Sequence, residues 1–85
     1  MPTSVTSEIR DQLLALIRGM VDHPEEVELV DVEGPRAWVF ELRVAEEDLG
    51  QVIGRQGRTA QALRTVLEAR ASETGGRYEF KILDD

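Results

Sequence analysis

Apolar residues recur every three or four positions near the N-terminus, which is the pattern of an amphipathic helix. The stripe consists of Ile9, Leu13, Ile17, Met20 and Val21, widened by Leu14 and Leu16. Thr6 or Ser7 can cap the first turn, and Pro24 is expected to end the helix near His23. Residues 1–5, ahead of the cap, are expected to form a flexible tail.

Two extended segments follow this helix, and a third lies at the end of the chain. Residues 26–33 and 36–44 are rich in alternating apolar side chains and are separated by the turn dipeptide Gly34-Pro35. We expect them to pair as an antiparallel hairpin. The third strand is predicted over 77–83, after a Gly75-Gly76 break.

Alternation also predicts which side chains of these strands face inward. The inward residues are Trp38, Phe40, Leu42 and Val44 in the second strand, and Tyr78, Phe80 and Ile82 in the third. Trp38 and Phe40 are tempting as an RNA-stacking surface. We assign them to the core instead, because Leu42 and Val44 share their face and a small domain needs these residues inside.

Two further helical segments, residues 46–53 and 58–72, lie between the second and third strands. Their apolar faces consist of Leu49, Val52 and Ile53 in the first and Leu63, Val66, Leu67 and Ala71 in the second. A crossover through both helices brings the last strand parallel to the second strand. The predicted fold is therefore α+β, one domain over residues 1–85. Its order is helix–strand–strand–helix–helix–strand, with a mixed three-stranded sheet and helices on one face.

Gly54 and Gly57 join these two helices. Gly54 is expected to close the first as a left-handed cap, and Gly57 to let the backbone turn without Cβ strain. Exposed N–H groups at the start of the second helix form a natural anion site, and Arg55 and Arg58 add positive charge beside it. We interpret the turn as a phosphate-backbone clamp. The plainer alternative is a tight helix–helix turn with incidental arginines, because a bare G-x-x-G occurs by chance in many proteins.

Three acidic residues and a glycine precede this turn. Glu46, Glu47 and Asp48 complement the dipole of a helix start, and neighbouring carboxylates on a helix do not converge on one metal ion. Gly50 lowers helix stability by about 1 kcal/mol relative to alanine, which suggests that close packing or an approaching ligand requires it.

The chain has a net charge of −7, which argues against nucleic acid until its distribution is considered. Residues 1–50 carry 4 basic and 12 acidic side chains, a net of −8, whereas residues 51–81 carry 6 basic and 3 acidic, a net of +3. A basic patch on an acidic protein still attracts phosphate locally, but long-range steering is lost. Any nucleic-acid binding by the isolated chain is therefore expected to be weak.

Residues 48–64, which read DLGQVIGRQGRTAQALR, resemble the signature of KH domains, single-stranded nucleic-acid modules whose G-x-x-G loop clamps four nucleotides. More closely, they resemble the small bacterial proteins that consist of one KH domain and little else. The commoner KH pattern has a bulky aliphatic where this chain has Ala60, a form that the small bacterial group tolerates; the next aliphatic is present as Leu63. The resemblance covers nearly the whole chain, because the predicted element order is that of type II KH domains.

This resemblance implies a set of RNA-binding residues. The N–H groups around Arg55 and Gln56 would hold phosphates, with Arg55 and Arg58 as charge partners. Val52 and Ile53 are candidates for an apolar groove floor, although one of them must also serve the core. Arg64, one turn along the second helix, either reaches an outer phosphate or is simply solvated. The predicted RNA-binding residues are Val52, Ile53, Gly54, Arg55, Gln56, Gly57, Arg58 and Arg64.

The function implied is that of a cytoplasmic single-stranded RNA-binding protein, an RNA chaperone or post-transcriptional regulator. The alternative is a protein–protein interaction module that pairs with a larger KH-containing RNA-binding protein and contacts RNA secondarily, which the acidic half of the chain favours modestly. A homodimer or a heterodimer is compatible with either function.

An enzyme is the weakest interpretation. The chain has no cysteine and His23 is its single histidine, so no nucleophile–base pair or metal-ligand cluster can be assembled, and we expect no cofactor and no metal. His23 is expected to be a surface residue or a helix-end cation. No apolar run approaches membrane-spanning length, so no membrane partner is expected.

Overall fold

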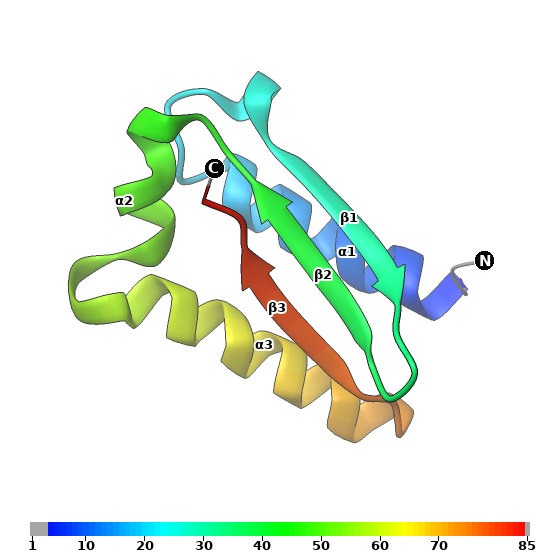
Figure 1. Cartoon of the computed structure of the whole chain (residues 1–85). Coiled ribbons are helices and arrows are strands. Elements are labelled where there is room, and N and C mark those ends of the chain that lie inside the picture. Colours follow the sequence, from blue (N-terminus) through cyan, green and yellow to red (C-terminus); the bar gives the residue numbers. More distant parts are fainter. Residues whose placement is uncertain (1–3, 85) are drawn as a thin grey trace.

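Residues 4–84, which the computed structural model describes, form a three-stranded sheet packed against helices (Figure 1). The α+β class and the predicted order of elements are confirmed. The bounds are α1 Ser4–Arg18, β1 Glu28–Glu33, β2 Trp38–Arg43, α2 Leu49–Ile53, α3 Arg58–Thr74 and β3 Tyr78–Ile82. Short 3-10 turns occur at η1 Pro24–Glu26, η2 Glu46–Asp48 and η3 Arg55–Gly57. No helix within this described range is long and apolar enough to cross a membrane.

The central strand of the sheet is β2. It pairs with β1 antiparallel and with β3 parallel, which confirms the predicted mixed sheet. The hairpin between β1 and β2 closes where the Gly34 N–H donates to the carbonyl of Ala37 at 2.9 Å. Parallel pairing of β2 and β3 requires a long crossover, and α2 and α3 supply it. Figure 1 shows α1 and α3 on the same side of the sheet.

The core lies between the sheet and these helices. Phe40 and Leu42 in β2 have no exposed surface, and Phe80 in β3 is almost completely buried. The helices contribute Ile9, Leu13 and Ile17 from α1, Val52 from α2, and Leu63 and Leu67 from α3. Tyr78 and Ile82, at the two ends of β3, are partly buried and pack against this cluster. The predicted inward face of the strands is therefore confirmed at its centre.

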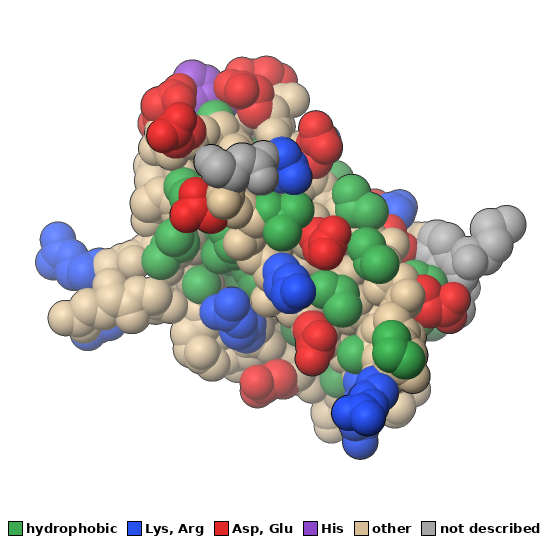
Figure 2. All heavy atoms as spheres, in the orientation of Figure 1, with side chains coloured by type: hydrophobic (Ala, Val, Ile, Leu, Met, Phe, Trp, Pro, Cys, Tyr) green, Lys and Arg blue, Asp and Glu red, His purple; other side chains and the backbone are tan. Residues whose placement is uncertain are grey.

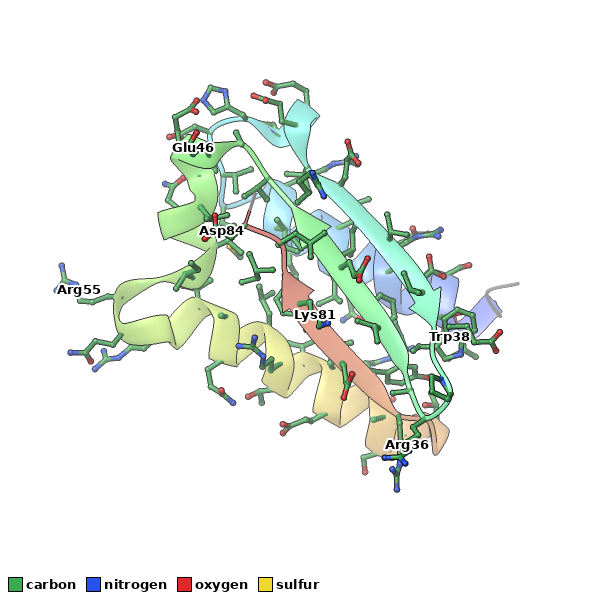
Figure 3. The ribbon with its side chains drawn as sticks, in the orientation of Figure 1. Arg36, Trp38, Glu46, Arg55, Lys81 and Asp84 are labelled. Atoms are coloured by element: carbon green, nitrogen blue, oxygen red, sulfur yellow. The ribbon has the colours of Figure 1, made fainter. Side chains whose placement is uncertain are left out.

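Trp38 departs from that prediction. It begins β2 at the hairpin end of the sheet, where it pairs with Glu33 and Tyr78 (Figure 3). Its side chain is only partly buried and does not belong to the core cluster that contains Phe40. Alternation assigns the face of a strand residue correctly, but burial also depends on how far along the strand the covering helices reach. At this end of β2, Trp38 is therefore only partly buried.

Helix α1 begins earlier than its capping residues predicted. It starts at Ser4, so Val5 is helical and packs against the core instead of lying in a tail. Thr6 lies inside the first turns and is 1% exposed, which excludes it from a capping position at the helix start. Residues 1–3 of the predicted tail lie outside the described range.

The same helix also ends earlier than predicted, at Arg18 instead of near Pro24. Gly19 follows, with its N–H donating to the carbonyl of Ala15 at 3.2 Å, and glycine is a poor helix former. The apolar residues beyond it, Met20 and Val21, still pack against the core from the turn. Leu16, predicted to widen the buried stripe, is instead 44% exposed.

One charged pair lies between α1 and the sheet. Asp31 of β1 points toward the helices, and its 6% exposed side chain accepts a hydrogen bond from Arg10 Nη1 at 3.0 Å through Oδ1. The other oxygen, Oδ2, is buried without a hydrogen-bond partner in the described part of the chain. A buried carboxylate is destabilising unless it is paired, so the ion pair with Arg10 offsets the cost of burying Asp31.

The opposite face of the sheet carries side chains of mixed character (Figure 2). Val30 and Val32 of β1 are 50% and 39% exposed. The strand register places Val30 beside Glu41 of β2, which in turn pairs with Lys81 of β3. Val32 pairs with Val39 of β2, so a small apolar cluster of Val30, Val32 and Val39 lies beside the charged side chains of β2 and β3.

Candidate nucleic-acid interface

The turn between α2 and α3 begins with a glycine that no other residue can replace without strain. Gly54 has φ 79° and ψ 168°, and its N–H donates to the carbonyl of Gly50 at 2.8 Å. The positive φ was predicted, but the extended ψ means that Gly54 is not the left-handed cap expected for it. A Cβ at this position would lie 2.7 Å from the backbone nitrogen of Thr59. Close approach of the chain to itself thus requires glycine here.

The next residues turn the backbone into α3. Gln56 has φ 58° and ψ 27°, and Gly57 has φ 74° and ψ 14°, so both lie in the left-handed region. The turn is closed by the Gly57 N–H, which donates to the Gly54 carbonyl at 3.1 Å, and by the Arg58 N–H, which donates to the Arg55 carbonyl. These bonds do not use the N–H groups of Arg55 and Gln56, which leaves both donors for a ligand.

Positive charge surrounds these donors. Arg55, Gln56 and Arg58 are all exposed, and neither arginine forms an ion pair with any carboxylate in residues 4–84. Arg55 projects away from the body of the protein at the tip of the turn (Figure 3). The positive end of the α3 dipole lies at the same place. Together these groups form a candidate site for an anion.

The two apolar residues ahead of the turn separate into different roles. Val52 has no exposed surface and belongs to the core, whereas Ile53 is 39% exposed. This settles the alternative left open by the sequence: of the pair, only Ile53 presents an apolar surface beside the turn. Gly50 is exposed and a Cβ added there would meet no atom within 4 Å, so close packing does not explain this glycine.

A groove lies between α3 and the edge strand β3, further along α3 than the turn. It is lined by Arg64, Leu67, Glu68, Tyr78, Glu79, Phe80 and Lys81. The guanidinium carbon of Arg64 lies 5.8 Å from the centre of the Phe80 ring, a cation–π distance, and Nη2 reaches the Phe80 carbonyl at 3.5 Å. Arg64 is therefore held against β3 while its side chain remains exposed to solvent.

Asp48 is a structural residue that the sequence did not single out. Predicted together with Glu46 and Glu47 as a surface complement to a helix dipole, it is instead completely buried. Its carboxylate accepts the backbone N–H of Asp22 at 3.2 Å and that of His23 at 2.9 Å. Asp48 thereby ties the segment that follows α1 to the start of α2. Its acidic neighbours give no local signal that distinguishes it.

Acidic side chains gather around η1 and η2, at the other end of the short helix α2 from the turn (Figure 2). His23 lies there, as the predicted surface residue, with Nε2 3.3 Å from Glu47 Oε2 and Nδ1 3.6 Å from Glu25 Oε2. Ligand atoms of His23, Glu25 and Glu26 lie within 4.8 Å of one another. All three side chains are open to solvent, and such groups are ordinary on an acidic surface. Negative charge is therefore concentrated around η1 and η2, apart from the arginines of the glycine turn.

Comparison with known proteins agrees with this geometry. The family model KhpA/KhpB, KH domain, matches residues 10–82. The chain is 49% identical over 73 residues to the RNA-binding protein KhpA of Leifsonia xyli, and the alignment covers 86% of this chain and 93% of that protein. It is 39% identical to the RNA-binding protein KhpA of Chlamydia caviae, with 91% of this chain and 99% of that protein covered. No solved structure matches.

A third relative, the RNA-binding protein KhpA of Treponema pallidum, is 44% identical over 77 residues, which cover 89% of this chain and 96% of that protein. The family model and these relatives extend across the helices, the sheet and the glycine turn alike, beyond the seventeen-residue signature that first suggested them. The chain belongs to the KhpA/KhpB family of KH domains.

Proposed function

We propose that this chain binds single-stranded RNA by clamping its phosphate backbone at the Gly54–Gly57 turn, and that it acts as an RNA chaperone or post-transcriptional regulator. One observation carries the proposal. The N–H groups of Arg55 and Gln56 are free of the bonds that close the turn, at the N-terminus of α3 and between two unpaired arginines. Backbone donors at a helix start bind phosphate oxygens in many proteins. Relatives that align across most of this chain bear the name of RNA-binding protein.

The geometry suggests how a bound RNA strand would lie. Phosphates accept hydrogen bonds from the free N–H groups, while the guanidiniums of Arg55 and Arg58 offset their charge. The bases then face the groove between α3 and β3, where Ile53 supplies apolar contact near the turn and Arg64 supplies a planar cation further along. The turn positions the strand, and the groove contacts its bases.

Weak, salt-dependent binding follows from the charge distribution. If the turn neutralises about two or three phosphates, log K falls with log salt at a slope of about −1.5 to −2. Affinity rises when a second RNA-binding chain is attached, because two weak clamps on one strand act at high effective concentration. A salt slope near zero contradicts a phosphate clamp.

The direct test inverts the charge of the turn. Arg55→Asp with Gln56→Asp keeps both glycines, and Asp is tolerated in the left-handed conformation that residue 56 adopts. We expect a change in unfolding free energy of about 0.5 kcal/mol or less and loss of binding to a labelled unstructured RNA. Gln12→Glu with Arg18→Glu, on exposed positions of α1, makes the same change in net charge away from the turn and is expected to bind normally. A folded turn variant with unchanged affinity rules out the clamp.

The exposed face of the sheet supports a second candidate function, that of a protein–protein interaction module. Val30 and Val32 are exposed there, on the acidic half of the chain. They suit an interaction module that forms a homodimer, or a heterodimer with a larger KH-containing RNA-binding protein, with RNA contact secondary. Val30→Asp with Val32→Asp then abolishes association with the partner, measured by analytical ultracentrifugation. Tight partner binding by a wild-type chain that shows no RNA binding favours this function over the clamp.

A further inference from the structure

A second pair of unpaired arginines lies at the far end of α3. Arg36 comes from the turn between β1 and β2, and Arg77 from the connection between α3 and β3, so they are distant in sequence. Both are exposed, and they line the same hollow together with Ala37, Gly76 and Tyr78. The two segments are joined by the Trp38 N–H, which donates to the Arg77 carbonyl at 2.9 Å.

Neither guanidinium forms an ion pair with the residues that the structure describes. Within residues 4–84, no carboxylate lies within ion-pairing distance of Arg36 or Arg77, although Glu68 and Glu79 line the same hollow. The turn that carries Arg36 is itself restrained, by the hydrogen bond from Gly34 to Ala37 and by the fixed φ of a proline. Two planar groups with free donors are therefore presented from short, anchored loops.

Helix α3 connects this pair with the glycine turn. It begins at the turn with Arg58, ends beside Gly75, and comprises 17 residues. At a rise of about 1.5 Å per residue, its two ends are about 25 Å apart. The groove between α3 and β3 lies between these two ends and is lined by two further cations, Arg64 and Lys81. It adjoins the hollow of Arg36 and Arg77, because Glu68, Tyr78 and Glu79 line both. Figure 3 places Lys81 between Arg55 at one extreme and Arg36 at the other.

We infer that Arg36 and Arg77 form a second phosphate contact for the RNA strand held at the glycine turn. This inference rests on the proposed function. Guanidinium groups bind phosphate oxygens through paired, parallel hydrogen bonds, which suits two free arginines at the end of a groove. A stacked strand advances about 3.4 Å per nucleotide, so 25 Å corresponds to about seven nucleotides. The footprint thus exceeds the roughly four nucleotides that a glycine turn clamps alone.

The test compares RNA lengths in the full chain. The probes are fluorescein-labelled single-stranded RNAs of four and of ten nucleotides with randomised sequence, and the variant is Arg36→Ala with Arg77→Ala. We expect the variant to lose affinity for the ten-nucleotide RNA roughly tenfold, with a salt slope reduced by about 1.4 for two lost contacts. Its affinity for the four-nucleotide RNA is expected to be unchanged. Arg18→Glu, which changes net charge equally but lies at the end of α1, leaves both affinities unchanged.

The outcomes separate this inference from the function on which it rests. Unchanged binding of the ten-nucleotide RNA by the Arg36/Arg77 variant overturns the second contact while leaving the clamp intact. An equal loss of affinity for both RNAs also overturns it, since that result indicates a general effect on the fold or on the electrostatic field of the protein. Loss of a protein partner with undiminished RNA binding assigns the arginines to a protein interface and overturns it too. Failure of the wild-type chain to bind either RNA refutes the proposed function itself.

Discussion

The two glycines of the turn are predicted to differ in how strongly they resist substitution. Both have positive φ, but their surroundings are unlike. A methyl group on Gly57 meets no atom within 4 Å, whereas one on Gly54 lies 2.7 Å from both the Cβ and the backbone nitrogen of Thr59. The Thr59 hydroxyl can rotate away from such a clash, but neither the Cβ nor the backbone nitrogen of this residue can move without shifting the start of α3.

These differences set the expected magnitudes. Gly57→Ala places an alanine in the left-handed region and is expected to lower the free energy of unfolding by about 1–2 kcal/mol. Gly54→Ala adds about 1–3 kcal/mol of strain, because its φ and ψ are populated essentially by glycine only, and the clash with Thr59 comes on top. We therefore expect a loss of at least about 3 kcal/mol, a large part of the total stability of a small domain.

Urea denaturation of both variants, followed by circular dichroism, measures the two losses under the same conditions. Thr59→Ala in the Gly54→Ala background removes the hydroxyl but leaves the contacts with the Cβ and the backbone nitrogen, so it should restore only a minor part of the stability. Equal losses for the two glycines, or a smaller loss at Gly54, refute the assigned turn geometry. Full rescue by Thr59→Ala means instead that only the side chain conflicts.

Substitutions at three other positions, Trp38, Gly50 and Asp48, test the surroundings that the structure assigns to them, each by a denaturation curve. Trp38→Ala is expected to cost about 1–2 kcal/mol, against about 3–5 for the fully buried Phe40→Ala; equal losses place Trp38 in the core. Gly50→Ala should stabilise the chain by about 0.5–1 kcal/mol, and reduced RNA binding by this more stable variant identifies a ligand contact at that glycine. Asp48→Ala leaves two backbone N–H groups without their acceptor and is expected to cost about 2 kcal/mol or more, whereas Asp48→Asn keeps one acceptor oxygen and should cost less; a neutral Asp48→Ala contradicts the anchoring role.

The arrangement of elements was predictable from the sequence because local patterns determine it. Helical and strand periods, the turn dipeptides and the rule that parallel strands need a crossover led to the observed order and to the mixed sheet. The position of the glycine turn followed in the same way, since Gly54 and Gly57 stand between two helical stripes. A glycine predicts a positive φ, but it carries no information about ψ, and so the conformation of Gly54 was assigned wrongly.

The remaining errors concern burial, which depends on contacts between distant segments. Consecutive helical residues point in different directions, so only one of Val52 and Ile53 can face the sheet, and which one depends on how α2 is seated. Asp48 is buried because the chain after α1 folds back over it, a contact across 26 positions from Asp22. Local charge patterns treat it like its exposed neighbours. Trp38 is on the inward face but is the first residue of β2 and is only partly buried.

The pairing of Arg10 with Asp31 has a consequence for how this protein can assemble. β1 is an outer strand of the sheet, and such strands are prone to recruit a further strand from another molecule. Inward-pointing charged residues on an edge strand disfavour such pairing, and Asp31 points inward from β1 with Oδ2 buried and without a hydrogen-bond partner in the described residues. Sheet extension across β1 is therefore penalised. The fold thereby resists open-ended polymerisation at this edge, and higher concentrations of the protein should favour discrete complexes over fibres.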